Sequence, residues 1–375
     1  MTKRGFKSAI AVVLIIASLF SLFACKKSKY EPVKSTEEEN TVVMRLKYND
    51  NTYDVKYELY RAFFLNYKSE IDGGDSSVWA GENKEYYIEK INDVIIDKIC
   101  YIYSALELAS QCGINMYSSD VEDQIEEYIR MSVEGDLALG VEGYGDYNAY
   151  LEALKRDNLN YQAQVLLYRY SIAVDKIQSH FIGNLTEEGV DIDTVNGKLT
   201  YTIDEVKTFY YSDDCLRIMR AYINSDYFTP DEAAEKAERM RNKIISATAS
   251  GDNIVALTIV QNSTSSMADV EKGVLAKHNL NKMYYSALTD AAFSLEPFGV
   301  SEIIPISDTL GSGLYVLYRA EKSDEHFTKY YNYIVYTYLT ELIGTKHEDC
   351  ADKLADNVTF TQEYYNIIHS AISMG

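Results

Sequence analysis

Leu216-Arg-Ile-Met-Arg-Ala-Tyr-Ile223 opens the stretch that decides the fold, and Gly313-Leu-Tyr-Val-Leu-Tyr-Arg319 closes it. The opening run is apolar enough to be a buried strand. Thr229-Pro-Asp-Glu232 follows with an N-cap, a proline at the first helical position and a capping-box glutamate, so a helix is predicted to begin there. Its apolar side chains recur at the spacing of one buried stripe, namely Ala233, Ala237, Met240, Ile244 and Thr248.

The rest of this stretch alternates short helical and extended signals. In chain order these are a stop at Ser250-Gly-Asp252, a helix from Ile254 to Val260, the segment 288–295, a turn at Gly299-Val-Ser301, and apolar runs at 303–306 and 314–318 around Gly311-Ser-Gly313. The last two runs are predicted to pair as a hairpin. Residues 212–322 are therefore predicted to form an α/β module inserted in a helical body.

Several motifs of this module occur in the order and spacing of a known family. Arg220-Ala-Tyr-Ile223 stands where that family has Ala-Ser-His-Ile, and Ser250-Gly-Asp252 stands where it has Gly-x-Asp-Phe. Asp290-Ala-Ala-Phe293-Ser-Leu295 nearly matches Ala-x-Phe-x-Leu, and Gly313-Leu-Tyr-Val-Leu317 stands for Gly-Tyr-His-Ile-Ile. The segment thus resembles the parvulin-type peptidyl-prolyl isomerases, in the arrangement of the PrsA and SurA foldases.

The resemblance also implies positions for an active site. Both family histidines are tyrosines in this chain, Tyr222 and Tyr315, and Glu271 lies in the shortened turn Val270-Glu-Lys-Gly273 that carries the family's acidic or thiol residue. These three are the candidate catalytic residues. The apolar side of the pocket, which would hold a proline ring, is expected at Met283, Tyr284, Leu288 and Phe293.

Two interpretations of the tyrosines remain open. Isomerisation breaks no covalent bond, so a pocket that desolvates and twists the imide could still lower the barrier of ~18–20 kcal/mol. Phenols, with a pKa of about 10, stay neutral at pH 7, however, and they are bulkier than imidazoles. The other interpretation makes Tyr222 and Tyr315 packing residues of a module kept as a scaffold or peptide-binding surface.

The amino-terminal segment reads as a lipoprotein signal peptide, residues 1–24. Lys3, Arg4 and Lys7 precede an apolar run, and Leu22-Phe-Ala-Cys25 follows it, with Cys25 as the lipidated first residue of the mature chain. The apolar run is shorter than the ~20 residues of a membrane-spanning helix, which disfavours an uncleaved anchor. Residues 25–40 are polar and aperiodic and are predicted to be a tether.

The charge balance bears on the class of partner. The chain has 36 Lys and Arg against 57 Asp and Glu, and removal of the three basic residues of the signal peptide leaves 33 against 57, a formal charge of −24. With no basic stripe in the sequence, nucleic acid is excluded as a partner, since phosphate contacts require one.

The cysteines and histidines suggest no metal site, and the sequence calls for no cofactor. Cys100 and Cys112 are separated by ~18 Å along a helix, too far for a disulfide, whereas a bridge between Cys215 and Cys350 stays open. No histidine pair has ligand spacing. Surface or capping roles are expected for the five histidines, His180, His278, His326, His347 and His369.

The remaining chain is predicted to be a helical bundle in two pieces, residues 41–211 and 323–375. Its predicted elements are a hairpin at 41–55, helices at 57–67, 88–109, 119–132, 147–156, 159–181 and 203–211, a helix at 326–343 stopped by Gly344, and a strand at 357–361 that joins the hairpin. A single amphipathic helix cannot bury its stripe alone, so the late helix must return to the first part. The fold class is therefore α+β, and the resemblance implies a discontinuous SurA-N-like chaperone domain around a parvulin-like module.

Tyrosine is unusually frequent, with 34 residues against a single tryptophan. Ordinary half-buried packing explains this, and so does a cradle for unfolded segments, because tyrosine offers broad apolar contact and a polar tip at little entropic cost. The two explanations stay open in the sequence.

Together these features predict a foldase or chaperone anchored by lipid at the extracytoplasmic face of the cell membrane. Its partners would be unfolded or newly exported polypeptides, bound between the helical body and the module, and the isomerase activity would be weak or lost. The alternatives are an active peptidyl-prolyl isomerase and a non-enzymatic ligand-binding or adhesion lipoprotein. The oligomeric state stays open, and a homodimer is compatible with the sequence.

Overall fold

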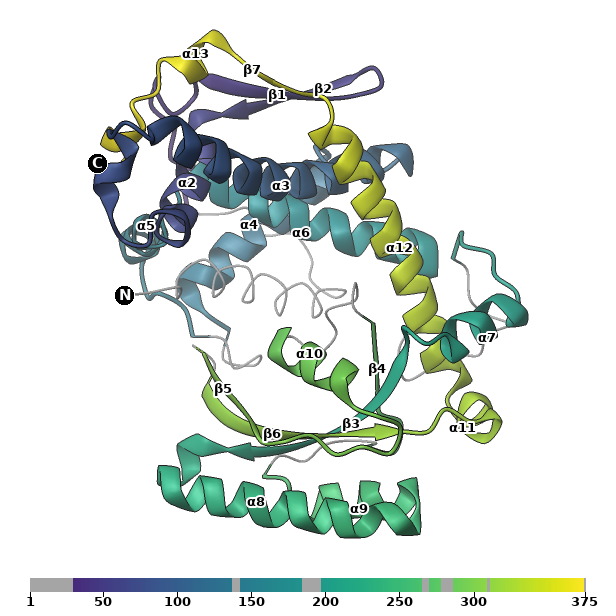
Figure 1. The fold of residues 1–375 in the computed structure, drawn as a ribbon. Coiled ribbons are helices and arrows are strands. Elements are labelled where there is room, and N and C mark those ends of the chain that lie inside the picture. Colours follow the sequence, from purple (N-terminus) through teal and green to yellow (C-terminus); the bar gives the residue numbers. More distant parts are fainter. Residues whose placement is uncertain are drawn as a thin grey trace. The chain divides into compact units, whose positions relative to one another are not determined.

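The computed structural model describes residues 30–136, 142–183, 197–264, 270–277, 286–308 and 311–373. Its contacts divide the chain into two compact units, of which unit 1 comprises residues 1–180 and 345–375 and unit 2 comprises residues 181–344. Unit 1 is thus discontinuous in sequence (Figure 1). Unit 2 includes more residues than the predicted module 212–322. That the predicted boundaries separate pieces that fold independently stays a prediction.

The first part of unit 1 is a β-hairpin followed by helices. Its elements are β1 (Val42–Tyr48), β2 (Asn51–Lys56), α2 (Tyr57–Asp72), η1 (Ser76–Trp79), α3 (Lys84–Gln111), α4 (Ser119–Glu134), α5 (Tyr147–Arg156) and α6 (Tyr161–Ile182). The predicted hairpin and helices of this region are confirmed. Helix α3, predicted at 88–109, buries one apolar face, on which Ile91, Ile95 and Ile99 are fully enclosed.

The carboxyl-terminal part of unit 1 adds a third strand to the hairpin. It consists of β7 (Val358–Phe360), α13 (Gln362–Tyr365) and η5 (His369–Ala371). Strand β7 pairs antiparallel with β1, with Met44 opposite Phe360, and gives the sheet order β2-β1-β7. The strand predicted within 357–361 is therefore confirmed, and it ties the two ends of the sequence into one unit.

Unit 2 contains the predicted α/β module. Its elements are α7 (Ile203–Tyr211), β3 (Leu216–Asn224), η3 (Ser225–Tyr227), α8 (Pro230–Ala247), η4 (Thr248–Ser250), α9 (Asp252–Asn262), β4 (Val274–Ala276), α10 (Ser286–Ser294), β5 (Ile304–Asp308), β6 (Gly311–Ala320) and α11 (Asp324–Lys329). The strands form an antiparallel sheet in the order β4-β3-β6-β5. The predicted strand, helices and closing hairpin are confirmed, whereas β4 was missed because three residues carry no periodic signal.

Helices cover both faces of the four-stranded sheet (Figure 1). Alternate residues of β3 and β6, including Met219, Ala221 and Tyr318, pack with α8 and α9 on one face. The intervening residues, including Ile218 and Leu317, pack with α10 on the other face. The capping box predicted for α8 is present, because the Thr229 hydroxyl accepts from the Glu232 amide and the Glu232 carboxylate accepts from the Thr229 amide. Because successive side chains of a strand point to opposite faces, β3 and β6 contribute apolar side chains to both helical layers.

The structure differs from the predicted helix 326–343 at both ends. Residue Tyr330 leaves helical geometry between α11 and α12 (Tyr331–Ala355), and α12 runs through Gly344 instead of stopping there. Beyond that glycine, His347, Cys350 and Leu354 are buried. A mid-helix glycine costs about 1 kcal/mol relative to alanine, and the burial of these side chains outweighs it.

The thiols and the histidines also bear on the sequence predictions. Cys100, Cys112, Cys215 and Cys350 are all free, so Cys215 and Cys350 form no bridge. His326, His347 and His369 are buried, so a surface role is wrong for these three. The signal peptide and Cys25 lie outside the described residues, and among the described helices none is long and apolar enough to cross a membrane.

Candidate functional site

Tyr222 and Tyr315 meet on the α10 face of the sheet in unit 2. They are directly opposite each other in the β3–β6 ladder, and their ring centroids are 4.8 Å apart at an interplanar angle of 41°. Antiparallel partners on one face bring their β-carbons to about 5 Å, so the strand register alone creates this contact. The two candidate catalytic tyrosines are therefore brought together.

Gly313 gives the Tyr222 ring its place. Gly313 is on β6, where it pairs with Asn224 of β3 and lies two residues before Tyr315, on the same face of the sheet. A β-carbon at Gly313 would collide with the Tyr222 ring, so the phenol lies across the bare backbone of β6. The main chain of Tyr222 is held as well, because its carbonyl accepts a hydrogen bond of 2.9 Å from the Thr264 amide. The tyrosine pair is thus a fixed element of the sheet.

The apolar neighbours of the pair agree in part with the predicted pocket. Leu288 is fully buried on α10, and Phe293 is partly buried in the same hydrophobic cluster as Tyr315. Met283 and Tyr284 lie outside the described residues. What the described part of this face offers is an aromatic and aliphatic surface with two phenol hydroxyls.

Glu271 is not brought to the tyrosines. Its carboxylate forms an ion pair of 2.8 Å with Lys329 of α11, and its carbonyl accepts a hydrogen bond from Arg217. Arg217 lies near the beginning of β3, five residues before Tyr222, which corresponds to about 16 Å along a strand. The position of Glu271 in the resembled motif therefore does not bring its side chain to the two tyrosines in this structure.

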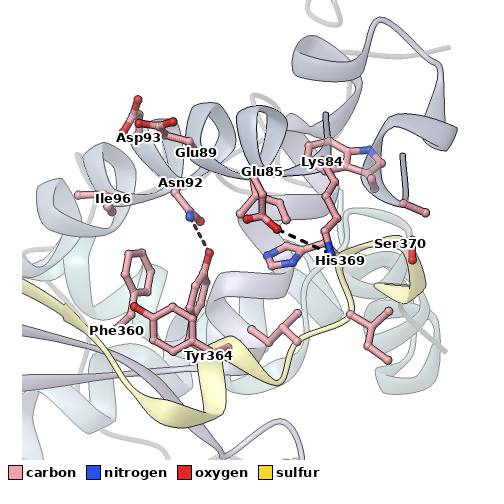
Figure 2. A pocket seen from close by; sticks show the side chains of 16 residues that line it. Lys84, Glu85, Glu89, Asn92, Asp93, Ile96, Phe360, Tyr364, His369 and Ser370 are labelled. Atoms are coloured by element: carbon pink, nitrogen blue, oxygen red, sulfur yellow. Dashed lines mark hydrogen bonds and ion pairs between the residues drawn. The ribbon is translucent and has the colours of Figure 1, made fainter. Parts of the chain in front are cut away.

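A second candidate site is a groove in unit 1 that no sequence motif marked. It lies between the first half of α3 and the chain from β7 to η5, and it encloses about 740 Å³ (Figure 2). Its apolar lining comes from η1 and from both of these segments, namely Trp79, Ile88, Ile96, Phe360, Tyr364, Tyr365, Ile367 and Ile368. Tyr365 and Ile368 each remain 68% exposed. The only signal in the sequence was the apolar, aperiodic run that follows Gln362.

A hydrogen-bond network fixes the floor of this groove. His369 Nε2 and the Tyr60 hydroxyl are 2.9 Å apart, the Tyr60 hydroxyl donates to Asn92 Oδ1 at 3.0 Å, and Asn92 Nδ2 donates to the Tyr364 hydroxyl at 2.6 Å. Figure 2 shows Asn92 pointing from α3 toward Tyr364. Since these bonds join α2, α3 and the carboxyl-terminal segment, the groove is preformed.

Burial governs the protonation of the histidine in the groove. It lowers the pKa of His369 to about 4, while Glu85 acts against this shift and Lys84 acts with it. The imidazole is therefore neutral at pH 7, where it contributes hydrogen bonding and no charge. The charge at the groove comes instead from exposed side chains of α3, which are Lys84 and the carboxylates Glu85, Glu89 and Asp93.

Among the described residues, no group of three or more His, Cys, Asp or Glu side chains is arranged to hold a metal ion.

Comparison with known proteins gives a distant structural resemblance. No protein-family model and no curated protein matches the sequence. Among solved structures, the foldase protein PrsA from Streptococcus pneumoniae str. Canada MDR_19A is similar at 16% identity and a TM-score of 0.31, covering 76% of this chain and 93% of its own. The foldase protein PrsA from Lactococcus lactis is similar at 15% identity and a TM-score of 0.25, covering 89% of this chain and 99% of its own. At this level the resemblance alone assigns no function to the chain.

Proposed function

We propose that the chain is an extracytoplasmic foldase or chaperone that holds unfolded segments of exported polypeptides, mainly through the groove of unit 1. The observation that carries this proposal is the groove itself, a preformed concavity of about 740 Å³ in which Tyr365 and Ile368 stay 68% exposed. Large apolar side chains left open in a concave surface are typical of a binding site. Such a surface shields apolar segments without reading one particular bond.

A weak or absent isomerase activity is the second part of the proposal. The Tyr222 ring lies against Gly313 and contacts Tyr315, so the two phenols fill space that a proline ring would need. Glu271 is engaged by Lys329 elsewhere in unit 2. The apolar cluster with Leu288 and Phe293 supports the alternative of a residual prolyl site, and assay of the purified protein separates the two.

The purified mature chain is expected to suppress aggregation of an unfolded test protein at a near-stoichiometric ratio. A proline-containing tetrapeptide should isomerise little faster than its spontaneous time of tens to hundreds of seconds. Light scattering of a refolding protein and a protease-coupled peptide assay measure the two activities. Tyr365→Ser should weaken suppression, whereas Tyr227→Ser, at a 71% exposed tyrosine of unit 2, is the matched control.

Two results would contradict this proposal. Strong isomerase turnover that disappears in Tyr222→Phe or Tyr315→Phe would make those phenols catalytic hydrogen-bond donors. If the purified protein showed neither aggregation suppression nor isomerase activity, the result would favour the alternative of a non-enzymatic ligand-binding or adhesion lipoprotein.

We also propose that a thioether lipid on Cys25 holds the protein at the membrane. Of the predicted tether 25–40, residues 30–40 contact the rest of unit 1, where Glu39 pairs with Arg61 at 2.7 Å and the Glu31 carbonyl accepts from the Tyr147 hydroxyl. A Cys25→Ser variant should lose the lipid, because serine has no sulfur to form the thioether, and it should appear unprocessed or released, because stable membrane attachment depends on the acyl chains. Metabolic labelling with a fatty acid and membrane fractionation measure this. A wild-type chain that fractionates with membranes and carries no labelled lipid would overturn the anchor.

A further inference from the structure

The groove of unit 1 has an acidic rim on one side of its apolar floor. Glu85, Glu89 and Asp93 follow one another at four-residue spacing along α3, and all three are exposed. Lys84 lies 3.7 Å from Glu85, while no ion pair of Glu89 or Asp93 occurs within the described part of the chain. Glu89 and Asp93 both line the groove one helical turn apart, and Figure 2 shows them on the side of α3 away from Tyr364. These two carboxylates are available to a cationic partner.

The dimensions of the groove match an extended peptide. From Lys84 to Ile96, α3 lines the groove over twelve residue steps, or about 18 Å at 1.5 Å per residue. An extended chain rises about 3.3 Å per residue, so roughly five residues fit. Its alternate side chains repeat every ~6.6 Å, close to the ~6 Å between residues four apart on a helix. Two alternate side chains can therefore reach Glu89 and Asp93 at once.

We propose that the groove selects extended segments in which lysine or arginine alternates with large apolar residues. This rests on the proposed chaperone function and names its substrate class. The cationic ends extend to Glu89 and Asp93, while their aliphatic stems cover the edge of the floor. The intervening apolar side chains contact the exposed Tyr365 and Ile368. Charge complementarity, combined with an apolar floor, favours this occupant over an acidic or a purely polar one.

Blocked pentapeptides of the pattern Lys-Phe-Lys-Phe-Lys, Gln-Phe-Gln-Phe-Gln and Glu-Phe-Glu-Phe-Glu test the proposal. With the full mature chain at low salt, the lysine peptide should bind about tenfold tighter than the glutamine peptide and tighter still than the glutamate peptide. Trp79, the only tryptophan in the chain, lines the groove, so its fluorescence reports binding locally. The preference should shrink as salt rises.

Paired variants separate the rim from the general acidity of the protein. Glu89→Gln combined with Asp93→Asn should weaken binding of the lysine peptide about tenfold and leave the affinity for the glutamine peptide unchanged. Glu348→Gln with Asp352→Asn is the matched control, because these exposed α12 residues have the same spacing and charge but do not line the groove. Equal losses in both variants, or equal affinities for the three wild-type peptides, would overturn the proposal.

The apolar half of the recognition has its own variant. Ile368→Ser should weaken the lysine peptide, yet leave unchanged the weak binding of Lys-Ala-Lys-Ala-Lys, which lacks the rings. If aggregation suppression is retained while the peptides are not discriminated, only this inference fails. If suppression and peptide binding are both absent, the proposed function fails with it.

Discussion

Replacing Arg217 with methionine is expected to destabilise unit 2 by about 3–5 kcal/mol, the usual cost of removing one partner from a buried ion pair. Only 3% of Arg217 is exposed. Its Nη1 donates to Asp252 Oδ2 and to the Glu321 carbonyl, both at 2.7 Å, and its Nη2 donates to the Glu271 carbonyl. Methionine fills similar space but leaves a carboxylate and two carbonyls without these donors.

The hydrogen bonds of Arg217 explain why the loss of stability should spread through unit 2. Arg217 lies near the start of β3, Asp252 begins α9, and Glu321 follows β6, so one guanidinium joins three elements. Asp252 Oδ1 also accepts from the Tyr318 hydroxyl at 2.8 Å. A bidentate, forked donor is needed to serve acceptors in several directions, and lysine cannot replace it.

Hydrogen exchange of the β3 and β6 amides measures the effect, because it reports unit 2 directly. Fluorescence of Trp79 follows unit 1 in the same samples. Arg239→Met is the control, since the Arg239 pair with Glu235 is exposed on α8 and should contribute less than about 1 kcal/mol. Unchanged protection of β3 in Arg217→Met would show that the network contributes nothing to stability.

A second variant identifies the source of the loss. Adding Asp252→Asn to Arg217→Met removes the stranded carboxylate, so the double variant should be more stable than Arg217→Met alone. If the stability losses of Arg217→Met and Asp252→Asn, each measured alone, simply added up in the double variant, the two side chains would not interact.

Acidification from pH 7 to pH 4 is expected to cost the wild type about 3 kcal/mol of unfolding free energy at His326 alone. Its Nδ1 lies 2.8 Å from the Tyr210 hydroxyl, and its Nε2 lies 2.9 Å from the Lys272 carbonyl. A carbonyl only accepts, so Nε2 carries the proton and Nδ1 accepts from Tyr210. The folded state therefore holds a neutral imidazole.

The direction of the effect follows from the pKa of His326. Burial lowers it from 6.5 to about 4, the Arg217 guanidinium acts in the same direction, and the Lys272 carbonyl, Asp252 and Glu271 act against it. Between these values the unfolded chain binds more protons than the folded one. The stability is thus fully present above pH 6.5 and is lost as the pH falls toward 4.

Comparison with His326→Gln isolates this contribution. Glutamine can donate to one neighbour and accept from the other, and it does not titrate. His347 and His369, whose pKa values burial also lowers, and Asp175, whose pKa burial raises to about 6, are present in both proteins and cancel. Urea unfolding at pH 7, 6, 5 and 4 should give curves that diverge by about 3 kcal/mol. Parallel curves would contradict the assignment.

Local signals in the sequence determined the elements of this protein. The capping box from Thr229 to Glu232, the hairpin around Asn49 and the apolar stripe of α3 each involve residues a few positions apart. The free energy of a cap or a tight turn belongs to those few residues, and this is why their sequence patterns predicted the structure correctly. Even the strand at 357–361 was visible, since its β-branched and aromatic residues suit a sheet.

Tertiary contacts decided the sites. The contact of Tyr222 with Tyr315 depends on a strand register set over more than ninety residues, and the burial of Arg217 depends on acceptors from three distant segments. The groove forms because β7 pairs with β1 and carries Tyr364 to Asn92, and α12 passes Gly344 because residues beyond it find a core. Each outcome balances a small local preference against burial and hydrogen bonds made with partners far away in the chain, and only the folded structure brings those partners into contact.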